Sequence, residues 1–161
     1  MATPTYDLIV SSTVATLTTS VTFSSLPSTG YQDLVVVING TAETESFIRP
    51  RFNSDSGNNY SMVRMEGNVA GNTESSSSAS ASDMIWGKLE DNNGLIIAQI
   101  FDYVATDKHK SVLVRSNAVQ EKVEAFALRY ASTSAITSIE IRGTGTGLEA
   151  GTVISIYGIA A

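Results

Sequence analysis

The sequence predicts an all-β fold, an antiparallel β-sandwich of jelly-roll-like type, and three observations lead to this prediction. About ten short strand-like runs follow one another between turn residues, which is typical of sandwiches and jelly rolls rather than of alternating β and α units. Only 16% of the residues are charged, and Ser, Thr, Gly and Ala are abundant. The length of 161 residues is that of one domain, so residues 1–161 are expected to form a single sandwich.

The first third of the chain contains a predicted edge strand, a half-buried strand and a central strand. Residues 6–14 begin with YDLIV and continue through Ser and Thr, which suits an edge strand with one wet face. Val21 and Phe23 alternate at period two before Pro27, so this second run is predicted to form a hairpin with the first. Residues 33–39, DLVVVIN, are apolar on both faces, which predicts a central strand covered from both sides.

The most specific turn of the chain follows a strand that a proline interrupts. Pro50 cannot donate to a ladder, so the strand at 47–53 is expected at a sheet edge or with a bulge. The loop at 53–59, NSDSGNN, places oxygen-bearing side chains as a calcium loop does. However, Gly57 stands where such a loop needs a ligand, and no helix is predicted on either side. A turn held by Asn and Asp caps is favoured, and neither a metal nor a cofactor is expected.

A strand, a polar stretch and a return to the core are predicted next. Residues 60–67 alternate as a strand does. The stretch around 68–83 contains ESSSSASASD, which has low complexity and little to bury, so we expect an exposed Ser-rich loop or arm. Residues 84–86, Met-Ile-Trp, rejoin the core, and the turn at 91–94 closes this part of the chain.

The second half is predicted to consist of regular strands separated by turns. The strand-like runs are 95–104, 111–119, 123–131, 136–143 and 152–159.

One segment and one Gly-rich stretch of this half leave alternatives open. Residues 119–131 also have Val119, Val123 and Phe126 at helical spacing, so a helix remains an alternative there, although the neighbouring strands favour a strand. The Gly-rich GTGTG at 143–147 is interpreted as a flexible connection rather than a phosphate cradle, because no helix follows it.

Composition and charge exclude several classes of partner. The net charge is −6 and no run of Lys or Arg occurs, so nucleic acid is not an expected partner. The chain has no Cys, which excludes disulfides, thiolate metal sites and thiol nucleophiles. The longest aliphatic run, 34–38, is too short to cross a bilayer, and the N-terminus lacks the features of a signal peptide, so no membrane partner is expected.

The residues that catalysis requires are sparse. His109 is the only histidine and lies between Lys108 and Lys110, where a solvated turn is the simplest interpretation. No nucleophile-elbow or Ser-x-x-Lys motif occurs, so an enzyme is not expected. Acidic pairs such as Glu43 and Glu45 leave a glycosidase as a remote alternative, since that reaction needs only two carboxylates across a cleft.

Several segments together resemble a known class of proteins. They are SVTFSSLP, YQDLVVVIN, RFNSDSGNNYS, AITSIEIRG and EAGTVISIYGI. In their order they resemble small β-sandwich virion proteins of tailed bacteriophages. The most distinctive positions are Arg51, Phe52, Asn53, Asp55, Gly57, Asn59 and Tyr60. The resemblance implies a head decoration or cement protein, a head fibre or a tail-fibre module, which works as a symmetric oligomer, often a homotrimer, and is not an enzyme.

Within this class we expect a capsid decoration or cement protein. Its partners would be the major capsid protein or other virion proteins and further copies of itself, and its location would be the virion, assembled in the host cytoplasm. No coiled-coil heptads or repeats supply the shaft that a whole fibre needs, which favours the head. The candidate contact residues are Asn53, Asp55, Asn58 and Tyr60, because loops carry function more often than strands do.

The alternative is a tail-fibre module or a receptor- or glycan-binding module of the phage tail. Aromatic side chains that could stack on sugars in such a module are Tyr31, Tyr60, Trp86 and Tyr103. Packing inside the sandwich is the competing interpretation for each of them.

Overall fold

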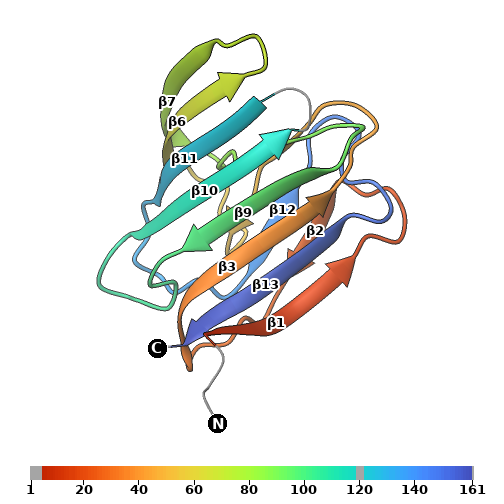
Figure 1. The fold of residues 1–161 in the computed structure, drawn as a ribbon. Helices are drawn as coiled ribbons and strands as arrows, with labels where there is room; N and C mark the ends of the chain where they lie inside the picture. Colours follow the sequence, from red (N-terminus) through yellow and green to blue (C-terminus); the bar gives the residue numbers. More distant parts are fainter. Residues whose placement is uncertain (1–4, 119–121, 161) are drawn as a thin grey trace.

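The regular secondary structure of the described part of the chain consists of β-strands alone. A computed structural model describes residues 5–118 and 122–160 (Figure 1). Within these ranges there are thirteen strands, and all pairings between them are antiparallel. The predicted all-β class is confirmed, with more strands than the sequence suggested. No helix within the described ranges is long and apolar enough to cross a membrane.

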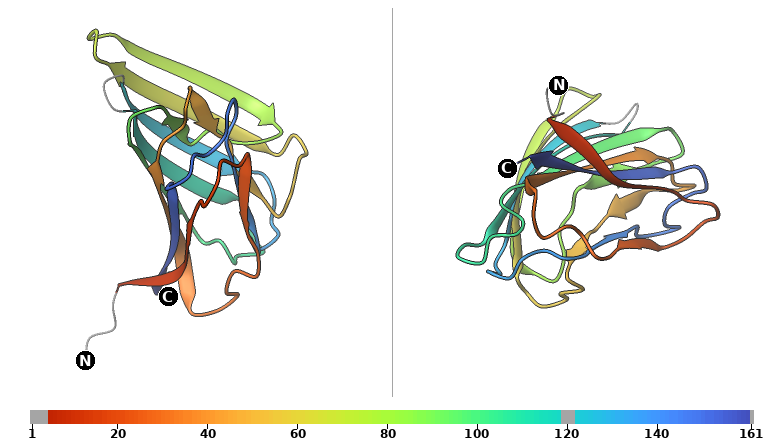
Figure 2. Two further views of the ribbon diagram at one scale, coloured as in Figure 1. Left: turned by 90° about the vertical axis from the view of Figure 1, so that its right-hand side faces the viewer. Right: turned by 90° about the horizontal axis from the view of Figure 1, so that it is seen from below.

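Eight strands form one large sheet, in the order β1-β13-β3-β9-β10-β11-β6-β7. In that order their bounds are Tyr6–Thr13, Val153–Ala160, Tyr31–Gly40, Gly94–Ile100, Lys110–Ala118, Lys122–Tyr130, Tyr60–Asn68 and Thr73–Ala81. A three-stranded sheet has the order β2-β12-β5, with bounds Ser20–Phe23, Ile139–Arg142 and Arg51–Phe52. A two-stranded sheet joins β4, Ser46–Ile48, to β8, Gly87–Leu89. The small sheets lie on one side of the large sheet, an arrangement consistent with a β-sandwich (Figures 1 and 2).

The core lies between the large sheet and the small ones. In β3 the side chains of Leu34, Val36 and Ile38 are fully buried, and alternate residues of β9, β10 and β11 are buried with them. The other face of β3, with Val35 and Val37, is only half-buried. The expectation that this strand is central is confirmed, but a second layer covers it on one face only.

The predicted hairpin between the first two strands is wrong. β1 pairs with β13, and β2 pairs with β12 in the opposite layer. Period-two alternation shows which side chains share a face, but it does not identify the strand with which they pair. β1 is nevertheless an edge strand, as the sequence predicted.

Two further predictions concern the middle of the chain. Pro50 does interrupt the strand at 47–53, since it separates β4 from β5, which belong to different sheets. The polar stretch around 68–83 is not a loop, because β7 pairs with β6 along most of its length. Its side chains are largely exposed, and β7 forms one edge of the large sheet.

The segment with competing helix and strand patterns is a strand where the structure describes it. β11 pairs with β10 on one side and with β6 on the other. Its alternate residues Glu124, Phe126, Leu128 and Tyr130 are buried, which is the period of a strand. Residues 119–121 lie outside the described ranges.

The Gly-rich segment at 143–147 is packed closely rather than forming a loose connection. The backbone of Thr18 pairs with that of Leu148, and the N–H of Gly143 donates to the carbonyl of Thr19 over 3.0 Å. Gly147 has a φ of +96°, and a side chain there would overlap the carbonyl oxygen of Thr18. Glycine is therefore required at this position by both backbone conformation and space.

Candidate functional site

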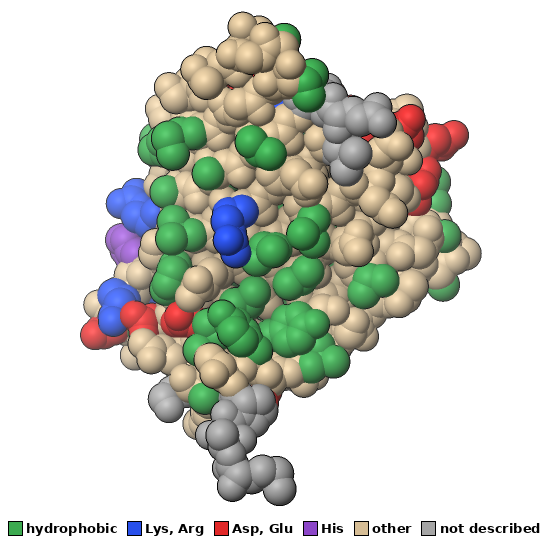
Figure 3. All heavy atoms as spheres, viewed as in Figure 1, with side chains coloured by type: hydrophobic (Ala, Val, Ile, Leu, Met, Phe, Trp, Pro, Cys, Tyr) green, Lys and Arg blue, Asp and Glu red, His purple; other side chains and the backbone are tan. Residues whose placement is uncertain are grey.

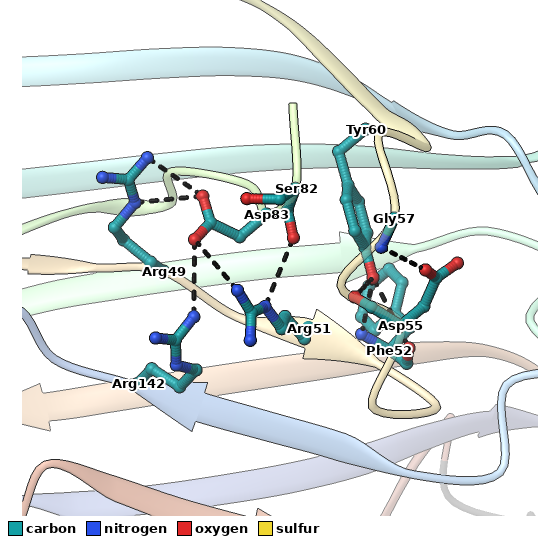
Figure 4. A network of polar contacts seen from close by, with 9 residues as sticks. All are labelled: Arg49, Arg51, Phe52, Asp55, Gly57, Tyr60, Ser82, Asp83 and Arg142. Atoms are coloured by element: carbon teal, nitrogen blue, oxygen red, sulfur yellow. Dashed lines mark hydrogen bonds and ion pairs between the residues drawn. The ribbon is translucent and has the colours of Figure 1, made fainter. Parts of the chain in front are cut away.

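Asp55 holds the predicted contact loop together from inside. Its carboxylate accepts a hydrogen bond from the N–H of Gly57 at 2.8 Å (Figure 4). It also accepts hydrogen bonds from Asn59 Nδ2 at 2.8 Å and from the Tyr130 hydroxyl at 3.0 Å. Partial burial alone raises the pKa of this carboxyl group, but these hydrogen bonds and the nearby charge of Arg51 outweigh burial and lower the pKa. The loop is thus a turn capped by a carboxylate.

Asn53 ties the same loop to a distant segment. Its Nδ2 donates to the carbonyl of Ala135 at 2.8 Å, and its Oδ1 accepts from the backbone N–H groups of Thr137 at 2.8 Å and Ser138 at 3.2 Å. Its backbone has a φ of +53°, which asparagine tolerates better than most residues. The Asn53 side chain therefore connects the two chain segments just beyond the point where the pairing of β5 with β12 ends.

Tyr60 is part of the core. Its ring stacks on that of Tyr130 with 4.9 Å between centroids, and its hydroxyl donates to the carbonyl of Asp55 at 3.0 Å. Burial is the main cause that raises the pKa of Tyr60. Asn58 differs from the other three predicted residues, because it is exposed and makes no side-chain hydrogen bond with a described residue. The structure thus brings Asp55 and Tyr60 together and leaves Asn58 facing solvent.

Three arginines converge on one carboxylate beside this loop, a cluster that sequence reasoning missed. Asp83 Oδ1 lies 2.9 Å from Arg49 Nη2, and Asp83 Oδ2 lies 3.4 Å from Arg142 Nη1 and 4.0 Å from Arg51 Nη2 (Figure 4). Arg51 Nε also donates to the carbonyl of Ser82 at 3.2 Å. The arginines come from β5, β12 and the end of β4, so the cluster fastens the chain after β7 onto the small sheets. The sequence signal was the alternation of Arg49 and Arg51, whose partner at Asp83 could not be predicted.

The aromatic residues considered for sugar stacking lie mostly in the core. Trp86 and Tyr103 are fully buried, as is Tyr60, and Tyr31 is half-buried. Tyr103 donates its hydroxyl hydrogen to the carbonyl of Pro27 over 2.5 Å. The competing interpretation, packing inside the fold, is confirmed for the three buried rings. Within the described ranges no group of three or more metal-ligating side chains is placed to hold a metal ion.

The face of the large sheet that points away from the small sheets is strongly apolar. We call this face the outer face (Figure 3). Its side chains come from alternate positions opposite the buried ones in each strand. Met65 is 61% exposed, Val123 63% and Tyr6 57%, although each is large and apolar. The exposed large hydrophobic residues of the outer face are Tyr6, Leu8, Val63, Met65, Leu95, Leu113 and Val123.

A hollow of about 500 Å³ lies in the outer face. Side chains from β1, β3, β9, β10, β11 and β6 line it, so it crosses most of the sheet. Ala125 and Ala127 provide small side chains, while Leu113 and Met65 provide large ones. Arg115 is the one charged residue among those lining it. A surface of this kind can bind another apolar surface but offers little for acid-base chemistry.

A comparison of the chain with models of known protein families, with curated proteins and with solved structures finds no match. The function is therefore argued from the residues and their geometry.

Proposed function

We propose that this chain is a structural protein that works by assembly, and that it decorates or cements the head of a tailed bacteriophage as a homo-oligomer with a jelly-roll-like fold. The observation that carries the proposal is the outer face. Soluble monomers rarely expose contiguous apolar patches of this extent, and such patches commonly mark protein interaction sites. The resemblance of the sequence to small virion proteins supplies the expected setting, with the major capsid protein or other virion proteins as partners.

The arrangement of the polar residues supports a binding role rather than a catalytic one. The carboxylate of Asp55 is occupied by three donors, and that of Asp83 by arginines. His109, the only histidine, is exposed in a turn. The large exposed side chains of the outer face are mostly apolar, so they favour binding by apolar contact over a broad surface.

The proposal is tested by mixing the purified protein with tailed-phage heads assembled without it, and in parallel with host cells. Saturable co-sedimentation with heads at many copies per head is the expected result. Binding to cells but not to heads would favour the alternative, a receptor- or glycan-binding module of the tail. Binding to neither would overturn the virion function.

The alternative has less support from the surface chemistry. A glycan-binding module presents aromatic rings to solvent, and three of the four rings considered for that role are buried. Tyr6 is a large exposed aromatic, but it lies among aliphatic side chains on the outer face. That setting suits protein contact better than sugar binding.

A further inference from the structure

The outer face has the size of one half of a stable protein interface. Neighbouring strands lie about 4.8 Å apart and rise about 3.3 Å per residue, so the part from β1 to β6 measures roughly 30 by 25 Å, or about 750 Å². The largest apolar patch on a typical monomer is about 300–600 Å². One side of a standard protein interface buries about 800 Å². The outer face as a whole therefore approaches the interface value, and its large exposed side chains are mostly apolar.

Two pairs of polar side chains on this face are already hydrogen-bonded within the chain. Ser11 Oγ and Ser155 Oγ lie 2.8 Å apart across β1 and β13. Gln99 Nε2 donates to Asp33 Oδ2 over 3.2 Å across β9 and β3. Unpaired polar groups oppose burial, whereas groups that already have a partner can lose water at little cost. The outer face can thus lose its hydration water on binding without leaving these groups without a hydrogen-bond partner.

Arg115 and Arg129 have no such partner on this face. Arg115 is exposed on β10 and Arg129 on β11, and neither makes a hydrogen bond or ion pair with a described residue. A partner that covers them must bring acceptors for the guanidinium groups. A second copy brings one carboxylate on the same face, that of Asp33, whose oxygens also accept hydrogen bonds from Gln99 Nε2 and from the backbone N–H of Asp102. In a two-fold interface a residue away from the axis meets a different residue, so the two Arg115 side chains need not face each other.

We propose that the outer face binds a second copy of this chain. Interfaces between identical subunits are more apolar than those between transient partners, and they are the commonest kind of permanent interface. An apolar face is unfavourable in water unless a partner covers it. A second copy of the chain is present wherever the protein is made, so it can serve as that partner. This inference rests on the proposed function in treating the face as an assembly surface, and it deepens that function by naming the occupant.

The test compares a substitution on the outer face with a matched one elsewhere. Leu113→Asp places a charge on β10, where the side chain is 49% exposed, and Leu17→Asp makes the same change in the loop after β1, where it is 54% exposed. Wild-type protein and Leu17→Asp are expected to sediment as the same oligomer at micromolar concentration. Leu113→Asp is expected to dissociate, with affinity reduced at least about 30-fold. Met65→Asp, on β6, should act in the same way, and circular dichroism verifies that each variant is folded.

The outcomes separate this inference from the proposed function. A monomeric wild-type protein, or a Leu113→Asp variant that remains oligomeric, would overturn self-association through the outer face. If a monomeric wild type still bound phage heads and Leu113→Asp abolished that binding, the face would contact another virion protein and only the inference would fail. An oligomer that Leu113→Asp dissociates but that binds no heads would support the inference while the virion function fails.

Discussion

At the scale of single residues, the candidate contact loop is held by one carboxylate. Asp55 joins its own turn to Tyr130 on β11, and Asn53 joins it to the segment before β12. These side chains are engaged in keeping the loop in shape. Any contact made by the loop with a partner would fall to exposed residues such as Asn58.

Replacing Asp55 by Asn should destabilise the protein by about 1–2 kcal/mol at neutral pH, because the amide cannot accept all three hydrogen bonds. The pKa of Asp55 is lowered in the folded state, so its contribution is present above the unfolded value of about 3.9 and is lost as the pH falls through the folded value. The difference between wild type and Asp55→Asn should therefore shrink on going from about pH 7 to about pH 2 in urea unfolding.

Asn58→Ala is the matched control for this prediction, since its side chain is exposed and makes no hydrogen bond with a described residue. Its free energy of unfolding should stay within about 0.5 kcal/mol of wild type. A stability difference between wild type and Asp55→Asn that is independent of pH would contradict the assigned charge of Asp55.

The arginine cluster makes a second prediction at the residue scale. Asp83→Asn leaves three guanidinium groups close together without a carboxylate, which should cost about 2 kcal/mol in unfolding free energy. Added salt screens both the attraction in wild type and the repulsion in the variant, so the difference between them should narrow at about 1 M NaCl. Glu140→Gln on β12 serves as control, because that carboxylate makes no ion pair with a described residue. Equal stability of Asp83→Asn and wild type would show that the arginines need no counter-charge.

At the scale of elements, strands could be predicted from the sequence but their partners could not. Alternation in β6, β10 and β11 follows from the side-chain period, and the structure has strands at those places. The pairing of β1 with β13 joins segments far apart in the chain, and no local pattern encodes it. The outer face was detectable in principle, since Val63 and Met65 and also Leu95 and Ile97 alternate on the side opposite the buried residues. For residues 33–39, apolar residues on both faces were instead interpreted as cover on both sides.

The turn between β12 and β13 also gives a prediction at the element scale. Gly147→Ala should destabilise the protein by about 3 kcal/mol, because a positive φ disfavours alanine and the new methyl group would overlap the carbonyl of Thr18. Gly151→Ala has a similar φ of +90° but open space, so it should cost only about 1 kcal/mol. Urea unfolding measures both losses of stability: Gly151→Ala reports backbone strain alone, and Gly147→Ala reports strain together with the overlap. Equal losses in the two variants would show that the contact with Thr18 relaxes freely.

At the scale of the whole molecule, the stability of the fold should depend on assembly. If copies bind through the outer face, mass action makes the melting temperature rise with protein concentration. Leu113→Asp should melt at a temperature that does not change with concentration, while Leu17→Asp should follow wild type. Differential scanning calorimetry over a hundredfold range of concentration, about two decades, makes this comparison. A concentration-independent wild type would argue against a coupling between folding and self-association.

The position of β13 between β1 and β3 has a consequence for biosynthesis. While the chain emerges from the ribosome, β1 has no neighbour to pair with until residues 153–160 have been made. Its backbone donors and acceptors, and those of β3 on the side that faces β13, stay open during that time, which favours slow folding and exposes edges to other nascent chains. Synthesis of the last described strand is thus the event that closes the large sheet.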